Sequence, residues 1–308
     1  MNEARNAPPS FVQKPKCPIC QGATTRASLH QPYAYWRCRE CGTAHLNPQP
    51  SAEFLESFYE TFHGRAKEGA LFAEFESRTA ADFPAKARIV LESLRGAITE
   101  QGEPHPTLDV GCGKGLFVRE MAGLGFMAEG IDVSRAGVEA GRLLGIGGLH
   151  AGQLEHQTNW AGRFDAVTAW ATIEHLSSPR EFLSAAHRVL RPGGLLFLDT
   201  GLADDFVDRM APGLVQWFDA PQHLFVFSAT GLKRLLDEAG FSVLKVDPNF
   251  ERSLVRRIAK LTRNRMLALA GQCLFRPALG RQVFQRMRME TKLPFGSLIF
   301  AVAAAEPA

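Results

Sequence analysis

The sequence predicts an α/β fold in which seven mainly parallel strands form a doubly wound sheet, preceded by a small zinc ribbon. Two observations predict the sheet. From residue 107 onward, short apolar runs alternate with amphipathic stretches, as in a parallel sheet covered by helices on both faces. The first run carries Asp109 and ends in a glycine-rich turn, and the second ends at Asp132. Two C-x-x-C pairs near the N-terminus predict the ribbon.

Seven strands are expected in this second part of the chain. They fall near residues 107–111, 127–132, 146–150, 164–170, 194–200, 241–247 and 296–303. Helices are expected between most of them. In a sheet of this kind ligands bind beyond the carboxyl ends of the strands, so the functional residues should gather at that edge.

The composition divides the chain into four segments. Residues 1–12 are expected to form a disordered lead-in, and residues 13–46 form the ribbon. A helical linker or lid is predicted over residues 47–84, followed by the α/β domain over residues 85–308. Within that domain, residues 248–295 are too many for a hairpin and are expected to form an insertion.

The glycine-rich turn favours a nucleoside-containing ligand. Residues 108–115 read Leu-Asp-Val-Gly-Cys-Gly-Lys-Gly. Glycine accepts positive φ and has no Cβ, so the backbone can approach a ligand closely. Asp132 is placed at the neighbouring strand tip, where it can accept hydrogen bonds from a ribose diol. A dinucleotide fingerprint would need a third glycine where Leu116 stands, and the chain contains no P-loop pattern.

The cysteine spacing predicts a structural metal site. Cys17 and Cys20 form one pair, Cys38 and Cys41 form the other, and 17 residues separate the pairs. This spacing is typical of a tetrahedral zinc site, in which four thiolates leave no position open for water. A segment of about 30 residues is too small to fold without such a metal. Reduced cysteines, and an N-terminus without an apolar signal segment, favour a cytoplasmic location.

Taken together, several motifs resemble those of class I S-adenosylmethionine-dependent methyltransferases from about residue 85 onward. They are the glycine-rich turn, Gly130-Ile131-Asp132, Phe164-Asp165, Ile173-Glu174-His175-Leu176 and Leu190-Arg191-Pro192-Gly193-Gly194. The four-cysteine ribbon followed by Asn47-Pro48 resembles bacterial methyltransferases of sugar and small-molecule pathways. The resemblance implies S-adenosylmethionine as cofactor alongside the structural zinc.

The resemblance also implies a set of cofactor contacts. Asp109 would help to hold the amino group of the methionine moiety, Asp132 would bind the ribose, and Gln153 and Leu154 would flank the adenine. Relatives often carry an acid near position 153, where glutamine must use its carbonyl instead. The expected contacts are Asp109, Gly111, Cys112, Gly113, Gly115, Asp132, Val133, Gln153, Leu154 and Trp170. Trp170 lies inside the fourth strand, where core packing is the better interpretation.

Three residues are candidates for catalysis. A methyltransferase must align the nucleophile with the methyl group, and it must remove a proton if the acceptor is a hydroxyl. His175 follows the fourth strand, and His223 lies in the loop after the fifth strand beside Trp217. An imidazole titrates near neutral pH and therefore suits a base, although either histidine could instead serve packing. In relatives the residues matching Glu174 and His175 can contact substrate, and the acidic group can help to bind a divalent metal.

A basic segment in the insertion suggests an anionic partner. Between residues 251 and 292, eleven lysines and arginines stand against two acidic residues. Residues 252–269 have the pattern of a basic amphipathic helix. Such a helix can lie on an anionic membrane surface, which would place the protein peripherally at the inner membrane, or it can bind an anionic substrate.

The leading functional hypothesis is methylation, at oxygen or carbon, of a sugar, nucleotide sugar, glycan or other small molecule. One alternative is a ribosomal or transfer RNA methyltransferase that uses the ribbon and the basic insertion to bind RNA. Against that alternative, the ribbon is not strongly basic. A second alternative is a non-catalytic adaptor that binds the cofactor, because Ala171 stands where relatives often carry a polar residue.

Overall fold

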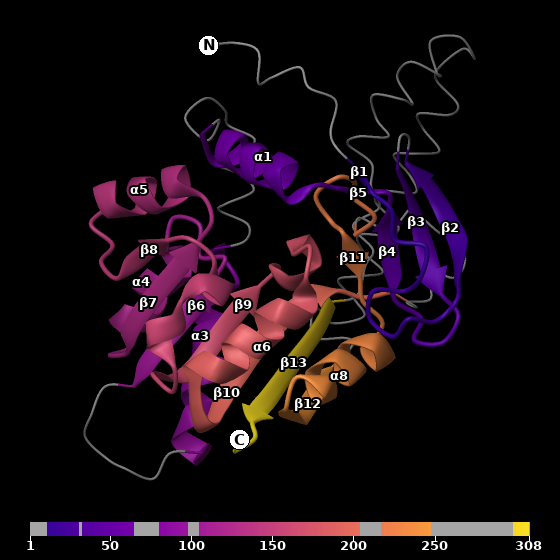
Figure 1. Ribbon diagram of the computed structural model, residues 1–308. Helices are drawn as coiled ribbons and strands as arrows, with labels where there is room; N and C mark the ends of the chain where they lie inside the picture. Colours follow the sequence, from indigo (N-terminus) through magenta and orange to yellow (C-terminus); the bar gives the residue numbers. More distant parts are fainter. Residues whose placement is uncertain are drawn as a thin grey trace, which may run out of the picture.

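The computed structural model describes residues 11–30, 33–64, 80–97, 105–203, 217–247 and 298–307. Its centre is a seven-stranded sheet (Figure 1) in the order β12-β13-β10-β9-β6-β7-β8. The strands are β6 (Pro106–Val110), β7 (Met127–Asp132), β8 (Leu149–Ala151), β9 (Phe164–Trp170), β10 (Leu190–Gly201), β12 (Phe241–Asp247) and β13 (Leu298–Ala305). Only β13 runs antiparallel to its neighbours in this sheet.

The sheet confirms the predicted fold class, and the largest shifts in the start of a strand are at β8 and β10. β8 begins at Leu149, because Gly145 and Gly148 adopt φ of 78° and 70° and form a turn where the strand was expected to start. β10 begins at Leu190, four residues before the expected start, and pairs with β9 across a register shift. Strand order reverses between β6 and β9, which is where ligands bind in open α/β sheets.

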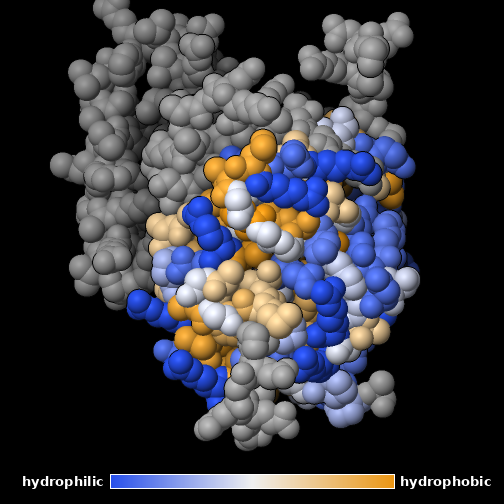
Figure 2. All heavy atoms as spheres, turned by 90° about the vertical axis from the view of Figure 1, so that its left-hand side faces the viewer, coloured by the Kyte–Doolittle hydropathy of each residue, from blue (hydrophilic) through white to orange (hydrophobic). Residues whose placement is uncertain are grey.

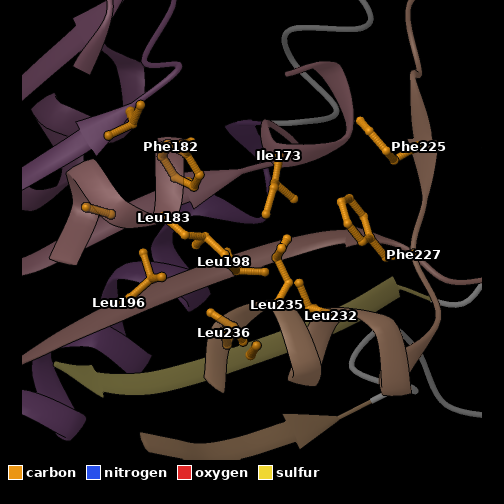
Figure 3. Close-up of a cluster of buried hydrophobic side chains, with 14 of the residues drawn as sticks. Ile173, Phe182, Leu183, Leu196, Leu198, Phe225, Phe227, Leu232, Leu235 and Leu236 are labelled. Carbon is orange, nitrogen blue, oxygen red and sulfur yellow. The ribbon is translucent and has the colours of Figure 1, made fainter. Parts of the chain in front are cut away.

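Helices cover both faces of the sheet, and alternation along β10 shows how. Leu196 and Leu198 point to the face covered by α6 (Pro179–Val189) and α8 (Ala229–Glu238), where Figure 3 shows the packed side chains. Leu195 and Phe197 point to the opposite face, covered by α3 (Phe83–Ala97) and α4 (Leu116–Gly123). A strand with apolar residues on both faces is typical of the centre of a parallel sheet.

The edge of the sheet at β8 is followed by a mixed surface. Helix α5 (Arg135–Leu143) lies beside β7 and β8. On this side of the molecule, hydrophobic and hydrophilic residues are interspersed (Figure 2). At the end of α5, Leu143 and Leu144 are exposed. No described helix is long and apolar enough to cross a bilayer.

The N-terminal ribbon is continuous with the large domain rather than separate from it. Its sheet has the order β11-β4-β3-β2. The first three of these in chain order are β2 (Thr24–His30), β3 (Tyr33–Cys38) and β4 (Ala44–Asn47). The fourth, β11 (Phe225–Val226), comes from beyond the fifth strand of the large sheet. The predicted ribbon, residues 13–46, therefore shares its sheet with a strand that belongs to the predicted α/β domain.

The structure describes parts of both flanking segments. Residues 11 and 12, assigned to the disordered lead-in, form strand β1 (Phe11–Val12), which pairs with β5 (Gln49–Pro50). The linker contains helix α1 (Ala52–Gly64), which lies near α5 at the carboxyl edge of the sheet (Figure 1). The insertion at 248–295, with its basic helix at 252–269, lies outside the described residues, as do residues 1–10.

Candidate active site and cysteine cluster

The turn between β6 and α4 requires glycine at two positions. Gly111 and Gly115 both have φ of 74°, a conformation that side chains disfavour. A Cβ on Gly111 would stand 2.5 Å from Oγ1 of Thr172, and one on Gly115 would stand 2.6 Å from a methyl group of Leu149. The turn therefore lies in close contact with the segment after β9 and with β8, and its backbone faces the carboxyl edge of the sheet.

Asp132 organises this turn from the tip of β7. One carboxylate oxygen accepts the N–H of Gly113 at 2.8 Å, and the other accepts the N–H of Ser134 at 2.8 Å. Each oxygen keeps a second lone pair, so the carboxylate can still accept hydrogen bonds from a ribose diol. The arrangement fits the ribose role expected for Asp132. Gly152, at the tip of β8, donates its N–H to the Asp132 carbonyl at 2.8 Å and brings Gln153 to the same edge.

Asp109 lies in β6, one residue before the strand ends, and is buried. Its carboxylate accepts a hydrogen bond of 2.7 Å from the Thr168 hydroxyl. Burial raises the pKa of Asp109 to about 7, although the bond from Thr168 opposes the shift. Its backbone position next to Val110 is consistent with a role at the methionine end of the cofactor, and that role stays a prediction.

Three further residues expected at the cofactor occupy core positions. The Cys112 side chain packs with Val118 and Val138, so only its backbone faces the turn. Leu154 is buried in the main core. Trp170 is buried against Phe117 and Phe300. Val133, next to Asp132, is the exposed exception. Side-chain contact between these buried residues and a cofactor stays a prediction.

The three catalytic candidates come together beside the glycine turn. The short helix η4 (Ile173–His175) carries Glu174 and His175, and the ligating atoms of these residues and of His223 all lie within 4.8 Å of one another. The His175 and His223 ring centroids are 4.8 Å apart. Thr172, which packs against Gly111, precedes η4 directly. Residues distant in sequence therefore form one cluster next to the predicted cofactor site.

Hydrogen bonds determine which histidine nitrogens are basic. Nδ1 of His223 lies 2.8 Å from the carbonyl oxygen of Trp217, and Nδ1 of His175 lies 3.0 Å from that of Gln222. A carbonyl can only accept, so Nδ1 of His223 carries the proton and its neutral ring has its lone pair on Nε2. Nδ1 of His175 also lies 3.0 Å from the Tyr59 hydroxyl, so it can either donate to the Gln222 carbonyl or accept from the tyrosine. Burial, aided by the nearby His223, lowers the pKa of His175 to about 3. His175 is therefore neutral throughout the physiological range.

Glu174 is the buried acid of the cluster. Its side chain is 2% exposed, and among the described residues Oε2 has no hydrogen-bond partner. Burial raises its pKa to about 8. Near pH 7 the group is therefore mainly a neutral carboxylic acid that can donate a hydrogen bond, and it becomes an anion above pH 8.

Tyr59 joins this cluster, although the sequence did not single it out. It projects from α1, and its hydroxyl lies 3.0 Å from Nδ1 of His175. Burial raises the pKa of Tyr59 well above its ordinary value, with further contributions from Glu174 and Asp132. The one available signal was scarcity, since the chain has three tyrosines and only this one lies in the predicted lid.

A buried ion pair supports the segment that carries η4, and it too was not anticipated. Ala171 has φ of 46° and donates its N–H to Asp199 at 2.7 Å. The other oxygen of Asp199 lies 2.6 Å from Nζ of Lys86, which sits 4.7 Å from the Trp170 ring. Ala171 adopts a left-handed backbone conformation directly after β9. The hydrogen bond from its N–H to Asp199 stabilises this conformation and so determines the path of the chain toward Glu174 and His175.

The four ribbon cysteines converge as the spacing predicts. Sγ of Cys17 lies 3.6 Å from that of Cys41, and Sγ of Cys20 lies 3.4 Å from that of Cys38. All four sulfur atoms lie within 4.8 Å of one another. Tetrahedral zinc with Zn–S bonds near 2.3 Å separates its sulfur ligands by about 3.8 Å. The donor set and its spacing therefore fit a zinc ion.

The order of the sheet, the glycine turn and the acidic residue at the second strand tip define a class I S-adenosylmethionine-dependent methyltransferase. A family model described as a methyltransferase domain matches residues 75–246, more than half of the chain. The chain therefore belongs to the methyltransferase domain family.

Curated proteins named O-methyltransferases are similar to this chain over part of their length. A ubiquinone biosynthesis O-methyltransferase from Caulobacter vibrioides is 37% identical over 154 residues, which cover 44% of this chain and 61% of the relative. The protein of the same name from Xanthomonas oryzae pv. oryzae is 38% identical over 101 residues, covering 30% of this chain and 41% of the relative. About half the length of these relatives is thus matched.

A solved structure shares the fold. It is the 1,6-didemethyltoxoflavin-N1-methyltransferase of Burkholderia thailandensis, determined with bound S-adenosylhomocysteine. The TM-score is 0.55 at 14% sequence identity, and the alignment covers 92% of this chain and 99% of that chain.

Proposed function

We propose that this protein transfers the methyl group of S-adenosylmethionine to a hydroxyl oxygen of a small molecule, with a sugar or glycan as the leading acceptor class. The observation that carries the proposal is the cluster of Glu174, His175 and His223 beside the glycine turn. Oxygen as the acceptor atom is supported by the O-methyltransferase names of the relatives. Transfer to carbon of a nucleotide sugar is a variant of the same proposal.

Bound S-adenosylmethionine supplies an electrophilic methyl group on a sulfonium. The chain must then orient the acceptor hydroxyl and accept its proton as the new oxygen–carbon bond forms. Nε2 of His223 carries a lone pair, since Nδ1 donates to the Trp217 carbonyl. We assign proton acceptance to His223. His175 is the weaker base because burial lowers its pKa, so we assign it to hydrogen bonding of the acceptor.

The same three side chains could hold a divalent cation. A cation bound there would displace the proton that Glu174 holds near pH 7, so its affinity should rise with pH. The assay therefore includes arms with and without Mg²⁺. Activity that does not change with Mg²⁺ would assign the three side chains to the acceptor alone, and activity that depends on Mg²⁺ would assign them to the cation.

The function is tested by two measurements on protein whose four-cysteine site is loaded with zinc. Isothermal titration with S-adenosylmethionine should show one site per chain, and a folded sample that does not bind would reject the cofactor. A methyl-transfer screen should then compare nucleotide sugars, lipid-linked glycans and hydroxylated aromatic quinone precursors. Transfer only to the aromatic compounds would retain the O-methyltransferase and reject the sugar. Binding without transfer to any of them would favour an adaptor.

We also propose that zinc fills the cysteine cluster and serves structure. Four sulfur donors close a tetrahedral shell, so no position is left for a reacting water. Membrane contact through residues 252–269 is a separate proposal based on their sequence. A vesicle flotation assay with anionic and neutral lipids tests it, and equal recovery from both lipids would reject an electrostatic contact.

A further inference from the structure

Strand β11 ties the ribbon to the loop that carries His223. In the ribbon sheet, Phe225 pairs with His45 and Val226 pairs with Ala44. The pairing extends toward the candidate base, because the N–H of Leu46 donates to the Leu224 carbonyl at 2.8 Å. Figure 1 shows β11 beside β4, between the ribbon and the large sheet. The residues that follow His223 are therefore hydrogen-bonded to the ribbon backbone.

Tyr35 contacts His223 itself. Its hydroxyl donates a hydrogen bond of 2.6 Å to the His223 carbonyl, and its side chain is fully buried. The ring edge packs on Phe218, with centroids 4.9 Å apart. Tyr35 lies on β3, the strand that ends at the metal-ligand candidate Cys38. A single ribbon side chain thus contacts both ends of the segment in which the Trp217 carbonyl orients His223.

The cysteine end of the ribbon is bonded to the residues just beyond β11. The Ser228 hydroxyl donates to the carbonyl of Cys41, and the Ser228 N–H donates to the Thr43 hydroxyl at 3.3 Å. On the opposite side, the Leu224 N–H donates to the Glu174 carbonyl at 2.8 Å. The loop is therefore held between the cysteine turns and the segment that carries Glu174.

We propose that the zinc ribbon is part of the acceptor half of the active site, and that Tyr35 is the residue through which it positions His223. This inference rests on the proposed function for its catalytic consequence, but the positioning of His223 can be measured without any acceptor. The glycine turn and Asp132 make none of these ribbon contacts. Changes in the ribbon should therefore affect the acceptor side and spare the cofactor side.

The test is Tyr35→Phe, which keeps the buried ring and removes one hydroxyl. Tyr33→Phe is the matched control, because Tyr33 lies on the same strand and packs on Phe11. Both zinc-loaded variants should keep their metal content, and both should bind S-adenosylmethionine within twofold of the original protein. The ring signals of His223 in a proton–nitrogen correlation spectrum, assigned by their loss in His223→Ala, should shift only in Tyr35→Phe.

With an acceptor in hand, Tyr35→Phe should lower kcat about 5- to 20-fold while Tyr33→Phe leaves it unchanged, because small misplacements of a base reduce the rate strongly. Unshifted His223 signals in Tyr35→Phe would overturn the proposal. Equal losses of cofactor affinity and turnover would also overturn it, since they would indicate general destabilisation. If no acceptor reacts, the proposed function fails, and the His223 signals still decide whether the ribbon positions the loop.

Removing the metal with a chelator provides a second perturbation. The apo protein should show the same direction of change in the His223 signals and should retain cofactor binding. Apo protein whose His223 signals are unchanged would contradict the coupling between the cysteine turns and the loop.

Discussion

The N–H of Gly113 donates a hydrogen bond of 2.8 Å to the carboxylate of Asp132, which joins the turn after β6 to the tip of β7. The second oxygen of the same carboxylate accepts the N–H of Ser134. One acidic side chain thus shapes the turn and remains available for a ribose. Both roles depend on two oxygen acceptors, and Asp132→Asn would leave only one.

Asp132→Asn should weaken binding of S-adenosylmethionine. An amide would place its N–H₂ group against one of the two backbone N–H donors, so the turn would lose a contact as well as the charge. Loss of a hydrogen bond to a charged group corresponds to about a 10- to 100-fold increase in Kd. Calorimetric titration measures this change. Asp237→Asn, on the exposed face of α8, is the control, and equal Kd values for both variants would contradict the assignment.

Gly115→Ala should destabilise the fold. A side chain at φ of 74° costs about 1–2 kcal/mol, and the overlap with Leu149 adds about 1–3 kcal/mol. Gly123→Ala is the matched control, because a Cβ there would meet nothing within 4 Å and should raise the helix stability by about 0.5–1 kcal/mol. Denaturant unfolding measures both values. Equal stabilities for the two variants would mean that the turn is not constrained as described.

His223→Ala should lower methyl transfer by at least about tenfold and leave cofactor affinity unchanged, because the variant removes the proton acceptor alone. His156→Ala, at an exposed position, is the control. Rates are measured at saturating cofactor with the acceptor found in the screen. Unchanged turnover in His223→Ala would exclude it as the base.

Glu174 should make stability fall as pH rises. Its pKa is raised from 4.5 to about 8 in the folded state, so the folded protein holds a proton that the unfolded chain releases. The contribution is fully present below pH 4.5 and is lost as pH rises toward 8. Glu174→Gln, which mimics the neutral acid, should remove on the order of 2 kcal/mol of the pH dependence between pH 6 and 8. Parallel unfolding curves for the two proteins across this range would contradict the burial of an acid here.

Cys38→Ser should abolish stoichiometric zinc and lower the melting temperature. One of the four sulfur donors is lost, and the remaining three no longer close the shell. The expected fall is about 5 °C or more, since each kcal/mol corresponds to about 2–4 °C in a protein of this size. Metal analysis and calorimetry measure both effects. Cys112→Ser, outside the cluster, should retain one zinc per chain, and zinc retained by Cys38→Ser would exclude the site.

The parts of the fold set by local sequence were predictable. Alternating strands and helices, glycines needing positive φ and the spacing of Cys17 to Cys41 all act over short distances along the chain. The structure confirms the strands and the convergence of the cysteines. Asp132 was also correctly placed at a strand tip, because strand ends follow directly from the apolar pattern.

The parts that depend on tertiary contacts were not predictable. The Lys86–Asp199 pair joins residues from α3 and β10, and neither position carries a local signal. Tyr59 reaches His175 only because α1 folds over the sheet. Strand β11 has only two residues, which is too few for a periodic pattern. Its pairing with β4 therefore could not be predicted from the sequence. These contacts connect elements whose registers are set by packing rather than by spacing.

The shared ribbon sheet has a consequence for how the polypeptide is made. The bond between Ser228 and Cys41 spans 187 positions, so the ribbon emerges from the ribosome long before its last strand exists. During translation, β4 therefore has an unpaired edge until β11 has been synthesised. The pairing of β4 with β11 joins residues far apart in the sequence, and contacts of this kind form slowly. C-terminally shortened nascent chains that stop before residue 225 should therefore show greater protease sensitivity in the ribbon than chains extended past residue 240.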